Sequence, residues 1–388
     1  MSTTSMTSST ANTADSGARP RRPYVHAVDV VRLITFVCVV GVHAVSMAMN
    51  PEDLTTGAAV SLLHFTRGAF FILSAFVLTY AQADRSLDVR RFWPRRFLYV
   101  GVPYLVWSVV YWWIAVDGVP RLDDVRQLGI EVITGTANYH LYFLLVSLQL
   151  YLLFPLLLWV VRRTRGHHGV LLAVSGLAEL GLLALTHYPA WPAGWSTLQA
   201  DVLVLSPVYQ FYFVLGALAA VLHERLRAWV RGHGWVVVGA LVAAGALHVG
   251  VYLLPLASGD SVQRAYDPLQ PSVVPWTVAV TLGLYAWGCA YADRRRSDGR
   301  LARFVGQASL ASFGVFLVHP LFLNTVLGRW FAWGSSTLDP TLAGVLAWSG
   351  TLVLAFAFAV VAIRTPLALP LTGRPRLPTT PRRRSRHV

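Results

Sequence analysis

The chain has 388 residues, of which 55% are hydrophobic and 13% are charged, with a net charge of +14. Soluble domains usually contain about 25% charged residues, so this composition excludes an ordinary soluble enzyme. The basic residues are all arginines and nearly all lie between apolar blocks, which argues for membrane lipids and against nucleic acid as a partner. The two cysteines, Cys38 and Cys289, lie inside apolar blocks without metal-ligand spacing, so we expect no metal site.

The apolar blocks are roughly 18–24 residues long, which is enough to cross a bilayer core of about 30 Å. They predict an all-α integral membrane protein with about ten transmembrane helices in one bundle. Residues 1–22 are expected to form a disordered cytoplasmic tail, residues 23–365 the membrane domain, and residues 366–388 a disordered basic tail near anionic lipid. We place the spans, in chain order, at 28–49, 58–81, 98–116, 138–161, 169–186, 203–222, 235–254, 273–292, 305–327 and 341–363.

The arginines also predict how the bundle is oriented. With the N-terminus in the cytoplasm, 26 of the 32 arginines fall in inner loops and tails, four in outer loops and two within spans. This asymmetry agrees with the positive-inside rule, and it favours an even number of spans because the loss of one would scramble the alternation. We therefore expect both termini in the cytoplasm.

The first predicted span carries three ionisable residues, Asp29, Arg32 and His43. Such groups at membrane depth are costly and are functional candidates by default. Arg32 and His43 share one face of an ideal helix and lie roughly 16 Å apart along its axis, with Arg32 near the cytoplasmic surface and His43 past the midplane. In the alternative interpretation, Asp29 and Arg32 form an interfacial salt bridge and His43 is a packing residue with a hydrogen-bonding partner.

The second predicted span presents one helical stripe of polar and aromatic residues. At a 3-4-3 spacing, its members are His64, Arg67, Phe71 and Ser74. Arg67 must face protein or a watery cavity, because a guanidinium in lipid is costly. It is a candidate for substrate binding or for a structural ion pair with Glu179 of the fifth span. Ser74 is either a substrate contact or a small residue that permits close helix packing.

The loop between the second and third spans is strongly basic and is expected in the cytoplasm. Its arginines include Arg90, Arg91, Arg95 and Arg96. Guanidinium groups bind phosphate bidentately, so the loop is a candidate docking site for a phosphate-rich cytoplasmic cofactor. The alternative is that the loop only fixes the topology and binds lipid headgroups.

His140 lies at the outer end of the fourth predicted span, and His319 lies about two-thirds of the way outward in the ninth. Together with His43 and His64, they place four histidines in the outer half of the membrane. Histidine is the side chain best suited to exchange protons near neutral pH. His140 is also the one that suits a purely interfacial hydrogen-bonding role.

Several sequence blocks resemble the acyltransferase-3 family of bacterial membrane acyltransferases. They are DVVR with His43, which gives Arg-x10-His; GAFFILSAFVL, similar to the family's G-x-x-F-F-x-x-S-G-F; RRFWPRRFLYVGVPYLVWS; and YHLYFLLVSLQLYLLFPLL with ASFGVFLVHPLF. They follow the family order over residues 24–363, nearly the whole folded chain. No one block is diagnostic, but the ordered set is specific. One departure is Ala75, where the family usually has glycine.

The resemblance implies transfer of an acyl group, commonly acetyl, from cytoplasmic acyl-CoA to a hydroxyl of a sugar-containing acceptor. That acceptor would be a cell-surface polysaccharide, a lipid-linked sugar or a glycosylated metabolite. The enzyme would be a multi-pass protein of the bacterial plasma membrane. The family motif falls on Arg32 and His43, and it implies that Arg32 binds the donor and His43 takes part in catalysis.

The arrangement of the other residues fits this chemistry. CoA phosphates would bind Arg32 and the loop arginines, and neutral His43 would take the proton from the acceptor hydroxyl. Arg67 or a protonated His319 would stabilise the oxyanion, and a histidyl-acyl intermediate is a variant of direct transfer. The remaining candidates would bind the acceptor: His64, Ser74 and His140.

A transporter or exporter of a polysaccharide or an acyl compound is the main alternative, because polar residues inside a helical bundle suit transport too. A transporter has no need of thioester chemistry, so acyl transfer from CoA distinguishes the two. A non-catalytic scaffold would be expected to avoid Arg67 and His43 inside the membrane.

Overall fold

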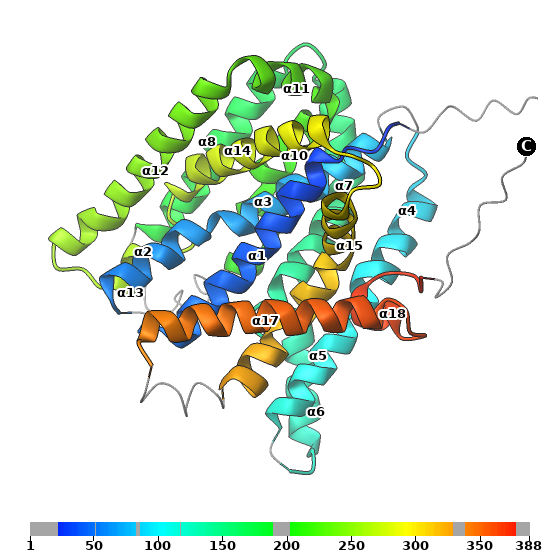
Figure 1. Ribbon diagram of the computed structural model, residues 1–388, viewed down its shortest axis with the longest axis vertical. Helices are drawn as coiled ribbons and strands as arrows, with labels where there is room; N and C mark the ends of the chain where they lie inside the picture. Colours follow the sequence, from blue (N-terminus) through cyan, green and yellow to red (C-terminus); the bar gives the residue numbers. More distant parts are fainter. Residues whose placement is uncertain are drawn as a thin grey trace, which may run out of the picture.

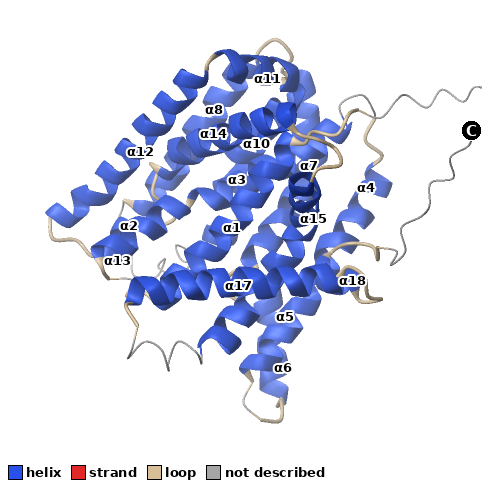
Figure 2. Ribbon diagram, viewed as in Figure 1, coloured by secondary structure: helices blue, strands red, loops and turns tan. Residues whose placement is uncertain are grey.

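The computed structural model describes residues 22–50, 52–82, 86–116, 118–188, 202–328 and 338–377. Within these ranges the chain forms helices joined by turns and loops, with no strand (Figures 1 and 2). The predicted all-α class is confirmed for this part of the chain. The predicted N-terminal tail lies outside the described residues apart from Arg22, and so does the C-terminal tail from residue 378 onward.

The described helices and helical turns follow in chain order. They are α1 (Ala27–Ala48), α2 (Leu54–Leu63), α3 (Phe65–Gln82), α4 (Val89–Arg96), η1 (Phe97–Gly101), α5 (Val102–Ala115), α6 (Leu122–Thr134), α7 (Tyr142–Arg163), α8 (His168–His187), η3 (Val202–Val204), η4 (Ser206–Tyr209), α10 (Gln210–Val221), α11 (His223–Gly232), α12 (Gly234–Ala257), α13 (Val262–Ala265), α14 (Val273–Arg294), α15 (Arg300–Leu321), η5 (Phe322–Leu327), α17 (Pro340–Ala362) and α18 (Ala368–Thr372). Nine candidate spans among the described residues are long and apolar enough to cross a membrane. A tenth is reached if η4–α10 and α11 form one span bent by 88°. The multi-span prediction is thus confirmed, whereas the orientation of the termini stays a prediction.

Helices α1 and α3 lie in the middle of the bundle and carry four of the predicted site residues, Arg32, His43, Arg67 and Ser74. Helix α3 packs against α10, and α1 packs against α14, α15 and α17, with α17 crossing α1 and α15 in Figure 1. A Cβ on Gly216 of α10 would lie 2.1 Å from the Ile72 carbonyl oxygen of α3. A Cβ on Gly288 of α14 would lie 2.4 Å from the Ala27 carbonyl oxygen of α1. Small residues at such contacts let helices approach closely in an apolar solvent.

Gly216→Val is therefore expected to destabilise the bundle, because the added atoms would displace the backbone of α3 rather than a flexible side chain. Overpacking of this kind costs about 1–3 kcal/mol or more. Gly181→Val in α8 is the control for the helix propensity of valine, since no atom lies within 4 Å of the added Cβ there. The midpoint of thermal unfolding in detergent should fall for the first variant only. Equal midpoints would contradict the close contact between α3 and α10.

The predicted span at 58–81 lies within one candidate span, Leu54–Gln82, whose helix is interrupted only at His64, between α2 and α3. One local feature differs from the sequence-based expectation. The predicted disordered tail at 366–388 instead begins with α18, whose Ala368 and Thr372 are fully buried. This short apolar stretch packs against α5, α15 and α17, and that burial outweighs its low intrinsic helix preference.

Candidate functional site

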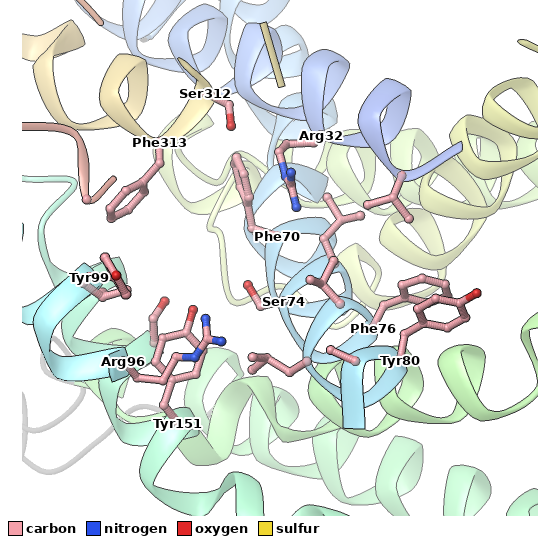
Figure 3. A pocket seen from close by; sticks show the side chains of 18 of the residues that line it. Arg32, Phe70, Ser74, Phe76, Tyr80, Arg96, Tyr99, Tyr151, Ser312 and Phe313 are labelled. Atoms are coloured by element: carbon pink, nitrogen blue, oxygen red, sulfur yellow. The ribbon is translucent and has the colours of Figure 1, made fainter. Parts of the chain in front are cut away.

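A cavity of about 960 Å³ opens between α1, α3, the α4–η1 junction, α7, α15 and the segment after α18. Three of the predicted site residues line it, namely Arg32, Ser74 and Arg96. Arg32 and Arg96 point into the cavity from opposite walls, and Ser74 lies between them (Figure 3). The cavity thus combines cationic groups with an apolar and aromatic lining, which suits a ligand with an anionic end and an apolar arm.

Arg32 is held by a short hydrogen-bonded chain. Its Nη1 donates to Ser309 Oγ at 3.1 Å, and Ser309 Oγ donates to Asp29 Oδ1 at 2.7 Å. Since a serine hydroxyl has one hydrogen, its donation to Asp29 turns the oxygen lone pairs toward Arg32. Asp29 also accepts from the Tyr24 hydroxyl at 2.6 Å. The alternative of a direct Asp29–Arg32 salt bridge is not found among the ion pairs of the described residues, because Ser309 stands between the two.

The four loop arginines divide between two faces of α4. Arg96 is half-buried beside Phe92, with its Cζ atom 5.3 Å from the ring centroid, and it lines the cavity. Phe92 and Arg96 are four residues apart and therefore share the helix face that packs against α7. Three arginines lie outside the cavity on exposed positions, namely Arg90, Arg91 and Arg95. Arg91 forms an ion pair with Asp88 at 3.3 Å.

Three of the four predicted histidines form a cluster deep in the bundle. The ring of His319 lies 5.2 Å from that of His43 and 5.2 Å from that of His140, centroid to centroid. Tyr139 covers His43 at 4.6 Å. The cluster joins α1, the turn before α7, and α15. Residues far apart in the sequence thus place three imidazoles within reach of one reacting group.

The hydrogen bonds of two of these imidazoles leave a nitrogen free. His319 Nδ1 lies 2.7 Å from the Phe316 carbonyl oxygen, so Nδ1 must carry the proton and donate it. His140 Nδ1 lies 3.0 Å from Asn138 Oδ1. In both rings Nε2 is buried and has no hydrogen-bonding partner. Neutral imidazoles with a free Nε2 lone pair are equipped to accept a proton.

A layer of phenylalanine rings lies between the cavity and the histidine cluster. Phe70, Phe143 and Phe316 all line the cavity, and their ring centroids are 5.5–6.3 Å apart. Phe316 also contacts the cluster, since its ring lies 5.3 Å from His140 and 5.9 Å from His319. Phe316 thus lines the cavity on one side and contacts the histidine cluster on the other.

His64 and Arg67 line a second, very small pocket together with Tyr209 and Tyr212. Arg67 Nη1 donates to the Tyr142 hydroxyl at 3.5 Å, and the described residues show no carboxylate paired with it. The predicted alternative of an ion pair with Glu179 is thus not found.

Glu179 is engaged elsewhere, because its carboxylate accepts from the Phe211 amide at 3.1 Å and from Gln210 Nε2 at 3.3 Å. Both donors belong to α10, the helix that packs between α3 and α8. Arg67 consequently remains a half-buried cation with only hydroxyl partners among the described residues.

Sequence reasoning missed parts of the site that depend on tertiary packing. Ser309 gives no signal of its own, because only the fold brings it to Arg32. Arg374 lines the cavity although it lies in the predicted tail. The apolar stretch LALPLT followed by Gly373 resembles a helix end, but it is too short to predict a packed helix that would bring Arg374 to the cavity. Among the described residues, no group of three or more His, Cys, Asp or Glu side chains is arranged to hold a metal ion.

Comparison with known proteins identifies the family. A family model described as an acyltransferase domain (Acyl_transf_3) matches residues 25–364. No curated protein and no solved structure matches the chain. The matched range contains Arg32, the histidine cluster and Arg67. Because it covers nearly the whole chain, the protein belongs to the acyltransferase-3 family and is a multi-pass membrane acyltransferase.

Proposed function

We propose that the protein transfers an acyl group, commonly acetyl, from cytoplasmic acyl-CoA to a hydroxyl of a sugar-containing acceptor at the bacterial plasma membrane. One observation carries the proposal: an arginine-lined cavity ends at a ring layer, and imidazoles with a free Nε2 lie behind it. The CoA phosphates bind Arg32 and Arg96, and the pantetheine arm passes Ser74 toward Phe316. A cell-surface polysaccharide, a lipid-linked sugar or a glycosylated metabolite is the acceptor.

The proposed reaction needs one base and one site for a developing negative charge. His43 takes the proton from the acceptor hydroxyl as its oxygen attacks the thioester carbonyl carbon. The carbonyl oxygen becomes an oxyanion, which Arg67 or a protonated His319 stabilises. The C–S bond then breaks, and the CoA thiolate takes a proton from the imidazolium and leaves as the thiol. His64 and His140 contact the acceptor.

The exposed arginines have a different role in this proposal. Arg90, Arg91 and Arg95 lie on the face of α4 away from the cavity. In this position they bind anionic lipid headgroups and draw CoA toward the membrane surface. A positively charged patch attracts anions over about one Debye length.

The test uses purified protein in nanodiscs with radiolabelled acetyl-CoA and a panel of glycans and lipid-linked sugars. Wild type should bind acetyl-CoA, release thiol and label an acceptor. Arg32→Gln should raise the Kd for acetyl-CoA about ten- to hundred-fold, since a hydrogen bond to a charged group contributes about 1.5–3 kcal/mol. Arg303→Gln, an exposed arginine of α15 that no described carboxylate pairs with, is the matched control and should leave Kd unchanged.

Two outcomes would count against the enzyme. Wild type that neither binds nor cleaves any acyl-CoA would remove the basis for the proposal and favour the transporter or exporter. Equal losses in Arg32→Gln and Arg303→Gln would mean that general surface charge, rather than the cavity, binds the donor.

A further inference from the structure

The chain after α17 folds back along the bundle as a closed loop. The Leu377 amide donates to the Ile363 carbonyl at 2.9 Å, which joins the two ends of the loop. Trp107 Nε1 of α5 donates to the Leu371 carbonyl at 3.2 Å, and Ala368 and Thr372 are fully buried. These contacts fix the position of the residues that follow α18.

Gly373 turns this segment toward the cavity. It ends α18 in the left-handed conformation, with φ at 62°, which glycine adopts at little cost. A Cβ at this position would lie 2.4 Å from the Tyr99 carbonyl oxygen and 2.5 Å from the ring of Phe313. Both neighbours line the cavity. Residue 373 must therefore be glycine on two counts, and the residue after it, Arg374, enters the cavity wall.

The charges around Arg374 are unbalanced. The lining residues that the structure describes include four arginines, Arg22, Arg32, Arg96 and Arg374, and no carboxylate. No described carboxylate lies within ion-pair distance of Arg374. Asp29, the one acidic residue of α1, accepts hydrogen bonds from the hydroxyls of Tyr24 and Ser309. Burial and the like charge of Arg32 lower the pKa of Arg374. Buried cations without a counter-charge are costly unless a ligand supplies one.

We propose that Arg374 binds a phosphate group of the acyl-CoA donor, together with Arg32 and Arg96 on the other walls of the cavity. The inference rests on the proposed function and adds a donor-binding residue from outside the range that the family model matches, which ends at 364. Three guanidinium groups from α1, α4 and the segment after α18 surround one space, as recognition of a diphosphate and a 3′-phosphate requires. The α18 loop is thus part of the donor site.

The test compares Arg374→Gln and Arg374→Lys with wild type, using acetyl-CoA and S-acetylpantetheine, which lacks the phosphates. Nanodiscs of phosphatidylcholine alone remove anionic lipid as a competing source of phosphate. Arg374→Gln should raise the Kd for acetyl-CoA about ten-fold or more, the loss typical of a hydrogen bond to a charged group. Arg374→Lys should retain part of the affinity, because it keeps the charge without the planar fork. Binding of S-acetylpantetheine should not change in either variant.

The control is Arg303→Gln, because Arg303 is exposed on α15 and does not line the cavity. Its Kd for acetyl-CoA should equal that of wild type. Wild-type affinity for acetyl-CoA in folded Arg374→Gln and Arg374→Lys would overturn the inference while the proposed function stands. An equal loss for acetyl-CoA and S-acetylpantetheine would also overturn it, since the effect would not involve phosphate. Wild type that fails to bind acetyl-CoA would instead overturn the proposed function.

Discussion

His43→Ala and His319→Ala are each expected to lower kcat for acyl transfer by about 10²–10⁴-fold, the usual contribution of a positioned acid or base. Their rings lie 5.2 Å apart, and His319 Nε2 is buried without a partner. Such a nitrogen costs stability unless a ligand uses it. The Kd for acetyl-CoA should change little, because the phenylalanine layer separates the histidines from the arginines of the cavity. Single-turnover measurements with labelled acetyl-CoA separate the two constants.

A matched control is His248, which is equally buried but fully bonded. Its Nδ1 lies 2.8 Å from Ser272 Oγ, and its Nε2 lies 3.0 Å from Ser61 Oγ. His248→Ala should lower the unfolding midpoint and leave kcat of the folded protein near wild type. If His43 and His319 act as one unit, the double variant should be no slower than the slower single variant. Folded single variants with wild-type kcat would exclude the cluster from the chemistry.

The sequence predicts the fold well for segments long and apolar enough to cross a membrane. A segment in lipid must satisfy its own backbone hydrogen bonds, so long apolar blocks become helices whatever their neighbours are. The rule fails at segments that are short or mixed. The predicted span at 203–222 stops at a sharp bend, after which α11 continues as a charged helix. The α18 segment is too short and too rich in arginine and proline nearby to be recognised before its packing is known.

The site is predicted only as far as helix geometry reaches. The predicted common depth of His43, His140 and His319 agrees with their ring contacts, although His140 lies in the turn before α7 rather than on a helix. His64 differs because it lies at the break between α2 and α3, where a 3.6-residue period no longer fixes direction. The four loop arginines divide between the cavity and the surface because they lie on different faces of α4. A count of charges in the sequence does not show this division. Ser309 reaches Arg32, and Arg374 reaches the cavity, through tertiary contacts that no local pattern encodes.

Arg67→Met is expected to lower kcat by about 10²–10³-fold, the loss typical of removing one donor to an oxyanion. Its guanidinium lies in the bundle interior with the Tyr142 hydroxyl as a 3.5 Å partner and no paired carboxylate among the described residues. Methionine fills similar space without the charge, so no counter-ion is left unpaired. Replacing a buried ionic group by an apolar residue of similar volume is often neutral or stabilising.

The same variant therefore separates a catalytic cation from a structural one. If Arg67 serves the reaction, Arg67→Met should unfold at the wild-type temperature or above and yet turn over slowly, with an unchanged Kd for acetyl-CoA. If Arg67 holds α3 to α7 through Tyr142, the unfolding midpoint should fall and kcat of the folded fraction should stay near wild type. Tyr142→Phe is the control, since it removes one hydroxyl that Arg67 contacts and leaves that of Tyr209 in the same pocket. Suppose that Arg67→Met has a low kcat and a wild-type unfolding midpoint, whereas Tyr142→Phe keeps wild-type kcat. The charge of Arg67 then serves the transition state, because a structural role through Tyr142 would make the loss of the Tyr142 hydroxyl harmful too.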